Sequence, residues 1–157
     1  LDGVELVHDK GYFRLVFTDC YCDYFRFRTL KNAEEVENEL GILLMRGKFL
    51  DGMDAGMMDH FKQKVEEFLS SFLPLEIERL YQHKYDAVIR FCNVLFRVDP
   101  VNELALAYGM HALNHTGSSQ EAILQYSLFV REYRQMMNEE YSTSYAELMS
   151  KNPPFHR

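Results

Sequence analysis

The chain has 157 residues, of which 47% are hydrophobic and 26% charged, and its formal net charge is −7. These values fit one ordinary domain with a real core and exclude global disorder. The net negative charge disfavours binding of the isolated chain to phosphate backbones or acidic membranes. No run approaches the roughly 18 apolar residues of a membrane span, and an odd number of cysteines predicts no disulfide framework. We therefore expect a cytoplasmic protein.

Residues 1–28 predict a β-hairpin followed by a linker. Residues 4–8 and 12–17 are β-branched and aromatic runs, and the turn between them contains Gly11, which can adopt a positive φ. Residues 19–27 are rich in aromatic side chains and fit either a third strand or a packed linker. The sequence opens at Leu1 without Met, so we expect a piece of a longer protein.

Residues 29–157 predict an all-α domain. Apolar residues three and four apart indicate a first helix over about 30–44, and two glycines in 47–52 end it. A second helix is expected to begin near Asp54. Pro74 lies inside its pattern, which continues to Leu80, so we expect a kink at Pro74 rather than an end.

Four further helices follow in the prediction. The helix over 86–98 is apolar around most of its surface, which indicates cover from neighbours on at least two sides. Asp99 and Pro100 indicate the start of the next helix, with Asp99 as its N-cap, and Gly117 is its expected stop. A last short helix is expected over 142–149.

The helix after Gly117 is expected to begin with a capping box, in which the Ser118 hydroxyl accepts from the Glu121 N–H. Its apolar residues recur at helical spacing and predict a core stripe. The stripe consists of Ala122, Ile123, Tyr126, Phe129, Val130 and Tyr133.

An internal repeat connects these helices. Residues 85–91 and 120–126 align at an offset of 35 and share an acidic residue, Ala, two aliphatic residues, a polar residue and an aromatic residue. Alanine at this place lets the two helices of a hairpin approach closely, and the aromatic residue fills the next turn. The fold class that this predicts is mainly α: a tetratricopeptide-like, right-handed array of antiparallel helical hairpins with a short N-terminal β-hairpin.

The order of several short motifs is more specific than the repeat. They are the segments 11–15, 23–25, 47–52, 84–88 and 98–103, then Gly117 with Ala122 and Tyr126 with Phe129. In this order the chain resembles the bacterial transcriptional activator domain of SARP-type regulators. In that family the all-α domain follows a winged-helix DNA-binding domain of the response-regulator type. The final hairpin of the winged helix corresponds to segment 11–15, and the segment that follows the hairpin corresponds to 23–25.

The resemblance implies a division of labour within a longer protein. The winged helix would bind promoter DNA through a recognition helix upstream of Leu1, and residues 1–28 would be its wing. Lys10 and Arg14, at and beside the turn, would contact the DNA backbone, although a merely solvated turn is the simpler interpretation for the chain alone. The helical domain would contact protein, through self-association, the transcription machinery or a neighbouring domain. No catalysis is expected.

One face of the helical array is a candidate protein-binding groove. Counting from the repeat alignment, Glu76 and Arg79 and then His111 and Asn114 are expected on the same side. Such a face grips an extended peptide or a neighbouring domain, and an ordinary solvated face explains the same residues equally well. His111 and His115 have a spacing that can chelate a metal, but no third ligand is evident, and we predict neither metal nor cofactor.

The alternative function is a tetratricopeptide-type adaptor that binds peptides and has no DNA role. The hairpin distinguishes the two hypotheses. A paired hairpin that packs on the first helix favours the regulator, whereas a loose tail over residues 1–28 favours the adaptor.

Overall fold

The structure, a computed structural model, describes residues 3–18, 29 and 56–153. The helix expected over 30–44, the motifs at 23–25 and 47–52, and the helix start near Asp54 lie outside the described residues. Contacts within the chain divide it into two units, Leu1–Leu43 and Leu44–Arg157, and each is described by itself. The boundary between residues 28 and 29 stays a prediction.

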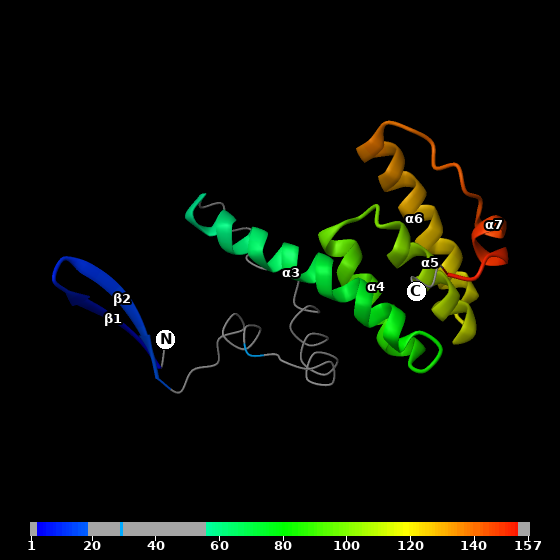
Figure 1. Cartoon of the computed structure of the whole chain (residues 1–157). Helices are drawn as coiled ribbons and strands as arrows, with labels where there is room; N and C mark the ends of the chain where they lie inside the picture. Colours follow the sequence, from blue (N-terminus) through cyan, green and yellow to red (C-terminus); the bar gives the residue numbers. More distant parts are fainter. Residues whose placement is uncertain (1–2, 19–28, 30–55, 154–157) are drawn as a thin grey trace. The chain divides into compact units, whose positions relative to one another are not determined.

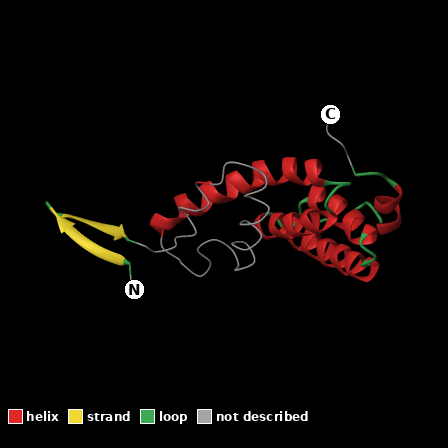
Figure 2. Cartoon of the chain, turned by 90° about the horizontal axis from the view of Figure 1, so that it is seen from below, coloured by secondary structure: helices red, strands yellow, loops and turns green. Residues whose placement is uncertain are grey.

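The predicted hairpin is confirmed in the first unit (Figures 1 and 2). Strands β1 (Val4–Asp9) and β2 (Tyr12–Phe17) pair antiparallel, with Val4 opposite Phe17 and Asp9 opposite Tyr12. Both turn residues have positive φ, 49° at Lys10 and 83° at Gly11. A two-residue turn of this kind matches the right-handed twist of the strands, which is why it closes so short a connection.

The register gives the hairpin two different faces. Side chains directly opposite each other lie on the same face, so the first face carries Val4, Leu6, His8, Phe13, Leu15 and Phe17. On this face the rings of His8 and Phe13 lie 4.7 Å apart. Leu6 and Phe13 are nonetheless 63% and 70% exposed. The second face mixes charged and apolar residues and includes Arg14.

The second unit is helical, as predicted (Figure 1). Its described part contains five helices: α3 (Gly56–Leu80), α4 (Tyr85–Val98), α5 (Glu103–His115), α6 (Ser119–Met137) and α7 (Tyr145–Ser150). Contacts join α3 to α4, α4 to α5 and α5 to α6, so successive helices form antiparallel hairpins. None of the described helices is long and apolar enough to cross a membrane.

Helix α3 runs without interruption through Pro74, so the prediction that the pattern continues past this proline is confirmed. Proline removes one N–H from the helical ladder, a loss that packing must offset. The helix has a buried stripe on both sides of the proline, made of Val65, Leu69, Leu73, Ile77 and Leu80. Burial of this stripe against the next helix stabilises α3 at the turn where Pro74 lacks its backbone hydrogen bond.

The core of the unit lies around α4 and α5. Helix α4 buries six of its 14 residues along one broad side, and α5 is buried continuously from Ala105 to Leu113. Helix α5 approaches its neighbours closely at Gly109, where an added Cβ would lie 3.3 Å from Cys92 Cβ and 3.6 Å from Gln125 Nε2. Glycine thus allows α5 to approach both α4 and α6.

The predicted start of α5 is wrong by three residues. Its N-cap is Asn102, whose Oδ1 accepts a 2.9 Å hydrogen bond from Ala105 N–H. Asp99 and Pro100 instead form the preceding turn, closed by Asn102 N–H donating to Asp99 O at 3.2 Å. Asp followed by Pro is also the favoured opening of a turn, so the same two residues satisfy either structure.

The join between α5 and α6 confirms one prediction and corrects another. Gly117 ends α5 with φ of 82°, Gly117 N–H donates to Asn114 O, and Ser118 N–H donates to Leu113 O at 2.8 Å. This is the left-handed glycine termination expected after a helix. The capping box is not formed, because the Ser118 side chain makes no cap hydrogen bond and its backbone carbonyl accepts from Ala122 N–H instead.

The core stripe predicted on α6 is partly wrong. Ala122 and Phe129 are buried, but Ile123 is 50% exposed. Its counterpart 35 residues earlier, Val88, is fully buried. Helix α4 has long neighbours before and after it, whereas among the described residues α6 is followed by the six-residue α7. The same repeat position is therefore left open on α6.

Candidate protein-interaction face

The four residues predicted to share a face belong to two helices in contact. Glu76 and Arg79 lie on the last turns of α3, and His111 and Asn114 occupy the corresponding places on α5. Helix α3 contacts α5, and α5 contacts α7, so the first helix of each repeat packs on the first helix of the next. We call this series the α3–α5–α7 face. The role of the four residues in binding stays a prediction.

Glu76 and Arg79 form an ion pair on α3. Arg79 Nε and Nη2 donate to Glu76 Oε2 at 2.9 and 2.7 Å. The Glu76 side chain is 11% exposed and that of Arg79 is 52% exposed. Both donors of the guanidinium edge reach one carboxylate oxygen, which holds the half-exposed Arg79 in a defined direction. The pair thus presents an ordered cationic group at the protein surface.

His111 is buried and covered by α7, so it does not lie on a solvated face. Its Nε2 lies 3.3 Å from Leu148 O on α7, and the residue is 8% exposed. The sequence did not predict this contact between α5 and α7. His115, one turn later, stacks on Tyr85 with ring centroids 4.5 Å apart. In the described part of the chain, no group of three metal-ligating side chains includes either histidine.

Asn114 also joins α5 to α7. Its Nδ2 donates to Met110 O at 3.0 Å within α5 and lies 3.4 Å from the Tyr145 hydroxyl on α7. Its Oδ1 accepts a 2.8 Å hydrogen bond from the Ser119 hydroxyl at the start of α6. One amide side chain therefore links three helices, which gives Asn114 a structural role in addition to any role in binding.

Aromatic side chains attach the segment that carries α7 to α6. Tyr141 packs against Phe129 and Tyr133, with centroids 4.9 and 5.1 Å away. Burial raises the pKa of Tyr141, and the nearby Glu103 carboxylate adds to the effect. Tyr126 packs edge-on to Tyr145, with centroids 5.7 Å apart.

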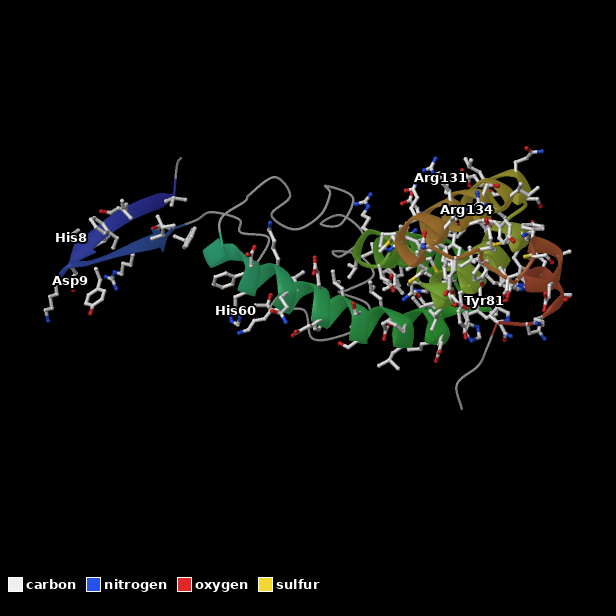
Figure 3. The ribbon with its side chains drawn as sticks, turned by 90° about the horizontal axis from the view of Figure 1, so that it is seen from above. His8, Asp9, His60, Tyr81, Arg131 and Arg134 are labelled. Carbon is white, nitrogen blue, oxygen red and sulfur yellow. The ribbon has the colours of Figure 1, made fainter. Side chains whose placement is uncertain are left out.

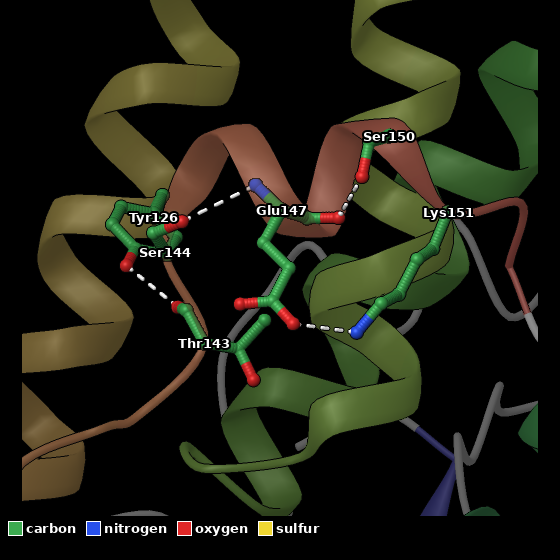
Figure 4. Close-up of polar contacts among 6 residues, drawn as sticks. All are labelled: Tyr126, Thr143, Ser144, Glu147, Ser150 and Lys151. Carbon is green, nitrogen blue, oxygen red and sulfur yellow. Dashed lines mark hydrogen bonds and ion pairs between the residues drawn. The ribbon is translucent and has the colours of Figure 1, made fainter.

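Hydrogen bonds fix the same segment (Figure 4). The Tyr126 hydroxyl donates to Thr143 O at 2.8 Å, and the Ser144 hydroxyl caps α7 by accepting from Glu147 N–H. At the other end of α7, Lys151 Nζ pairs with Glu147 Oε1 at 2.6 Å. No residue of α7 is fully buried. The helix is therefore held at its ends and by its neighbours rather than by a core of its own.

The repeat length could have revealed this cover. Leu148 follows Leu113 by 35 residues, and Tyr145 follows Met110 by the same interval. Helix α7 thus occupies the place that the first helix of a third hairpin would have. The predicted short helix over 142–149 is present as α7, although it begins three residues later, at Tyr145 after the N-cap Ser144. Its packing on α5 extends the series of hairpins by half a unit.

The two wing residues lie on the hairpin of the first unit. Lys10 forms the turn, and Arg14 on β2 pairs across the strands with Val7; both charged side chains are exposed. Figure 3 shows His8 and Asp9 at the same end of the hairpin. The two cations are thus available at a projecting turn, and their contact with DNA stays a prediction.

The described helices define an array of antiparallel helical hairpins, a class of fold whose outer faces bind other proteins. The family described as "Bacterial transcriptional activator domain" matches residues 22–151, which is most of the chain. The chain belongs to this family, and its matched part is a transcriptional activator-type region of bacterial origin. The family is regulatory and not a family of enzymes. Neither the curated proteins nor the solved structures include a match to the chain.

Proposed function

We propose that this chain is the C-terminal, protein-contacting part of a cytoplasmic, SARP-type DNA-binding regulator. In this proposal the hairpin is the wing of a winged helix of the response-regulator type, whose recognition helix binds the promoter. The helical unit then contacts protein, either the transcription machinery, a second copy or a neighbouring domain. The family match over residues 22–151 is the observation that carries the proposal.

The hairpin supports the DNA-binding part of the proposal. A two-stranded hairpin is at best marginally stable in water without further packing. The exposure of Leu6 and Phe13 on one face therefore suggests that further segments cover the hairpin in the parent protein. Lys10 and Arg14 supply cations near the turn, where a narrow projection can reach a phosphate backbone.

The adaptor hypothesis is less well supported. Residues 4–17 form a paired hairpin rather than a loose tail, which favours the regulator. The second criterion, packing of the hairpin on the first predicted helix, concerns residues 30–44 and lies outside the described residues.

A reporter assay tests the activation role. The chain is fused to an unrelated DNA-binding domain, and transcription from a promoter that carries its operator is measured in bacteria. We expect the fusion to raise transcription, and Arg79→Ala to lower the gain about fivefold, the effect of removing an interface side chain worth about 1 kcal/mol. The matched control is Lys64→Ala, which removes an exposed cation from the same helix.

Two results of this assay would contradict the proposal. If the unmodified fusion leaves transcription at the background level, the helical unit is not an activating contact. If Arg79→Ala and Lys64→Ala behave alike, the α3–α5–α7 face is not the surface used. Circular dichroism of each purified variant shows whether a loss reflects unfolding.

DNA binding gives a separate prediction. The isolated chain should bind duplex DNA no better than a generic acidic protein at physiological salt, because its net charge of −7 repels phosphates. A gel shift with a promoter library, comparing the chain with its full-length parent, measures this. Tight and sequence-specific binding by the chain alone would refute the proposed division of labour.

A further inference from the structure

A second surface, distinct from the α3–α5–α7 face, lies between α4 and α6. The two helices border a cavity of about 490 Å³ whose lining is mainly apolar, with the polar residues Asn93 of α4 and Gln125 of α6 among the apolar ones. One wall is formed by Ile89 and Phe96 of α4 and the other by Leu124 and Leu128 of α6, with Leu113 of α5 and Phe129 of α6 also in the lining. We call this cavity the α4–α6 groove.

The groove follows the helices. Ile89 and Phe96 are seven residues apart on α4, and Leu124 and Leu128 are four apart on α6, so each pair lies along one side of its helix. The α6 wall extends from Glu121 to Glu132, a distance of about 16 Å at the helical rise. Three turns of a bound helix would span the same length.

The α6 wall exposes apolar surface. Leu124 is 59% exposed and Leu128 is 42% exposed, although both line the groove. Their burial by a partner would remove apolar area from water, the dominant favourable term in protein association. The volume of the cavity also falls in the range of sites that take side chains or ligands rather than isolated waters.

The charges lie at the two ends of the α6 wall. Glu121 is at one end, and Glu132 is at the other, where Arg131 Nη2 pairs with Glu132 Oε1 at 3.1 Å. Arg131 is 61% exposed and projects outward from α6 (Figure 3). The three groups carry a net charge of −1, and the whole chain carries −7. This balance favours an occupant that is basic at its ends.

We propose that the α4–α6 groove binds an amphipathic helix of a partner protein, with an apolar stripe flanked by Lys or Arg. Both walls are helices whose own hydrogen bonds use their backbone groups, so the groove has no strand edge for an extended peptide. A helix satisfies its backbone internally and presents apolar residues at i, i+3, i+4 and i+7, which matches two apolar walls. One basic end meets Glu121, and the other lies beside the ion pair of Arg131 and Glu132.

The test measures binding of a designed peptide to the whole 157-residue chain. The probe is a fluorescein-labelled peptide of about 14 residues, with Leu at i, i+3, i+4 and i+7 and Lys at both ends, followed by fluorescence anisotropy. A peptide of the same composition with a scrambled order is the control. We expect saturable binding of the amphipathic peptide and at least about tenfold weaker binding of the scrambled one.

Variants of the chain then locate the site. Leu124→Glu is expected to weaken binding about tenfold or more, because it introduces a charge into the apolar wall. Ile123→Glu is the matched control: Ile123 is the preceding residue, is similarly exposed, and does not contribute to the lining. It should change binding less than about twofold. Glu132→Lys should weaken binding about threefold and reduce its dependence on salt.

Three outcomes would overturn the proposal. The first is equal binding of the two peptides, or no binding of either. The second is an equal loss with Ile123→Glu and Leu124→Glu, which would indicate a diffuse apolar contact. The third is a concentration-dependent dimer, seen by light scattering, that Leu124→Glu dissociates, since a second copy would then fill the groove. Unfolding by urea, measured for each variant, separates loss of the site from loss of the fold.

Discussion

Helices α4 and α6 begin with the same residue pattern, 35 residues apart, yet their surroundings differ. Helix α4 buries Ala87, Val88, Phe91, Cys92, Val94 and Leu95, whereas α6 buries Ala122 and Phe129. The first has a long helix before and after it, and in the described part of the chain the second is followed by the short α7. The place of a repeat in the series therefore decides how much of its apolar pattern becomes core and how much remains available to a partner.

Thiol labelling should show the largest difference between the two helices. Cys92 on α4 is fully buried, and this burial raises the pKa of its thiol. Its counterpart on α6, Ser127, is exposed. Both chains carry Cys20→Ser and Cys22→Ser. The Cys92 thiol should react with iodoacetamide at least about 10³-fold more slowly than the thiol introduced by Ser127→Cys, because Cys92 becomes accessible only when the helix unfolds.

The control for this measurement is the same pair of chains in urea. The chain that carries Ser127→Cys also carries Cys92→Ala, so each chain has one reactive thiol. Unfolding should make the two labelling rates similar. Equal rates in the native state would mean that α4 opens as readily as α6.

Truncation of the equivalent aromatic residues should give the next largest difference. Phe91 is fully buried, and Phe91→Ala is expected to lower the free energy of unfolding by about 3–5 kcal/mol. Tyr126 is half-buried, and Tyr126→Ala should cost about 1–2 kcal/mol through the lost hydrogen bond to Thr143 and ring contact with Tyr145. Urea denaturation monitored by circular dichroism measures both, and similar losses would contradict the comparison.

Alkaline pH should lower the free energy of unfolding through a buried tyrosine on α5. Burial raises the pKa of Tyr108 on α5 to about 12, and the nearby Glu78 carboxylate and Tyr81 phenol add to the effect. The contribution of Tyr108 to stability is then complete below pH 10, the ordinary pKa of tyrosine, and decreases as pH rises toward 12, because the unfolded chain loses this proton first.

Urea midpoints between pH 9 and about 12 measure this decrease. Tyr108→Phe should reduce the slope over that interval, and Tyr133→Phe, which removes a half-buried phenol from α6, is the matched control. An unchanged slope in Tyr108→Phe would assign the alkaline loss to other groups.

Truncation of Val88 on α4 and of its counterpart Ile123 on α6 should give the smallest difference in the free energy of unfolding. Val88→Ala removes two methyl groups from a fully buried site and should cost about 2 kcal/mol. Ile123→Ala changes the half-exposed counterpart and should cost less than about 1 kcal/mol. A larger loss at Ile123 than at Val88 would show that α6 has cover in solution.

Local patterns in the sequence predicted the elements but not all of their ends. β-Branched and aromatic runs around Gly11 predicted the hairpin, and apolar spacing predicted the helices on both sides of Pro74. Asp99 and Pro100 fit a helix start and a turn equally well, and the choice depends on Asn102, which also can cap. Competition among neighbouring side chains for the same backbone groups is not visible in a motif taken alone.

The candidate face was harder to predict than the fold. Counting along the repeat predicted that Glu76, Arg79, His111 and Asn114 share one side of the array, and the helices that carry them, α3 and α5, are in contact. Their role in binding stays a prediction. The contacts of Leu148 and Tyr145 with His111 and Asn114 were not predicted, because the count along the repeat was not carried on to α7, although the same 35-residue interval leads to it. The α4–α6 groove was missed because the exposure of Leu124 depends on which helices follow α6.

Gly109 has a consequence for the curvature of the array. The rotation from one helical hairpin to the next is small, and it accumulates into the superhelix of the fold. Gly109 has only a hydrogen atom where other residues have a Cβ, and α4, α5 and α6 lie close together there. An added Cβ would press on Cys92 of α4 and reach Gln125 of α6. A larger side chain there would act as a wedge between the hairpins. The width of the α4–α6 groove, and with it the size of any helix that it accepts, is thus tied to a single backbone position on α5.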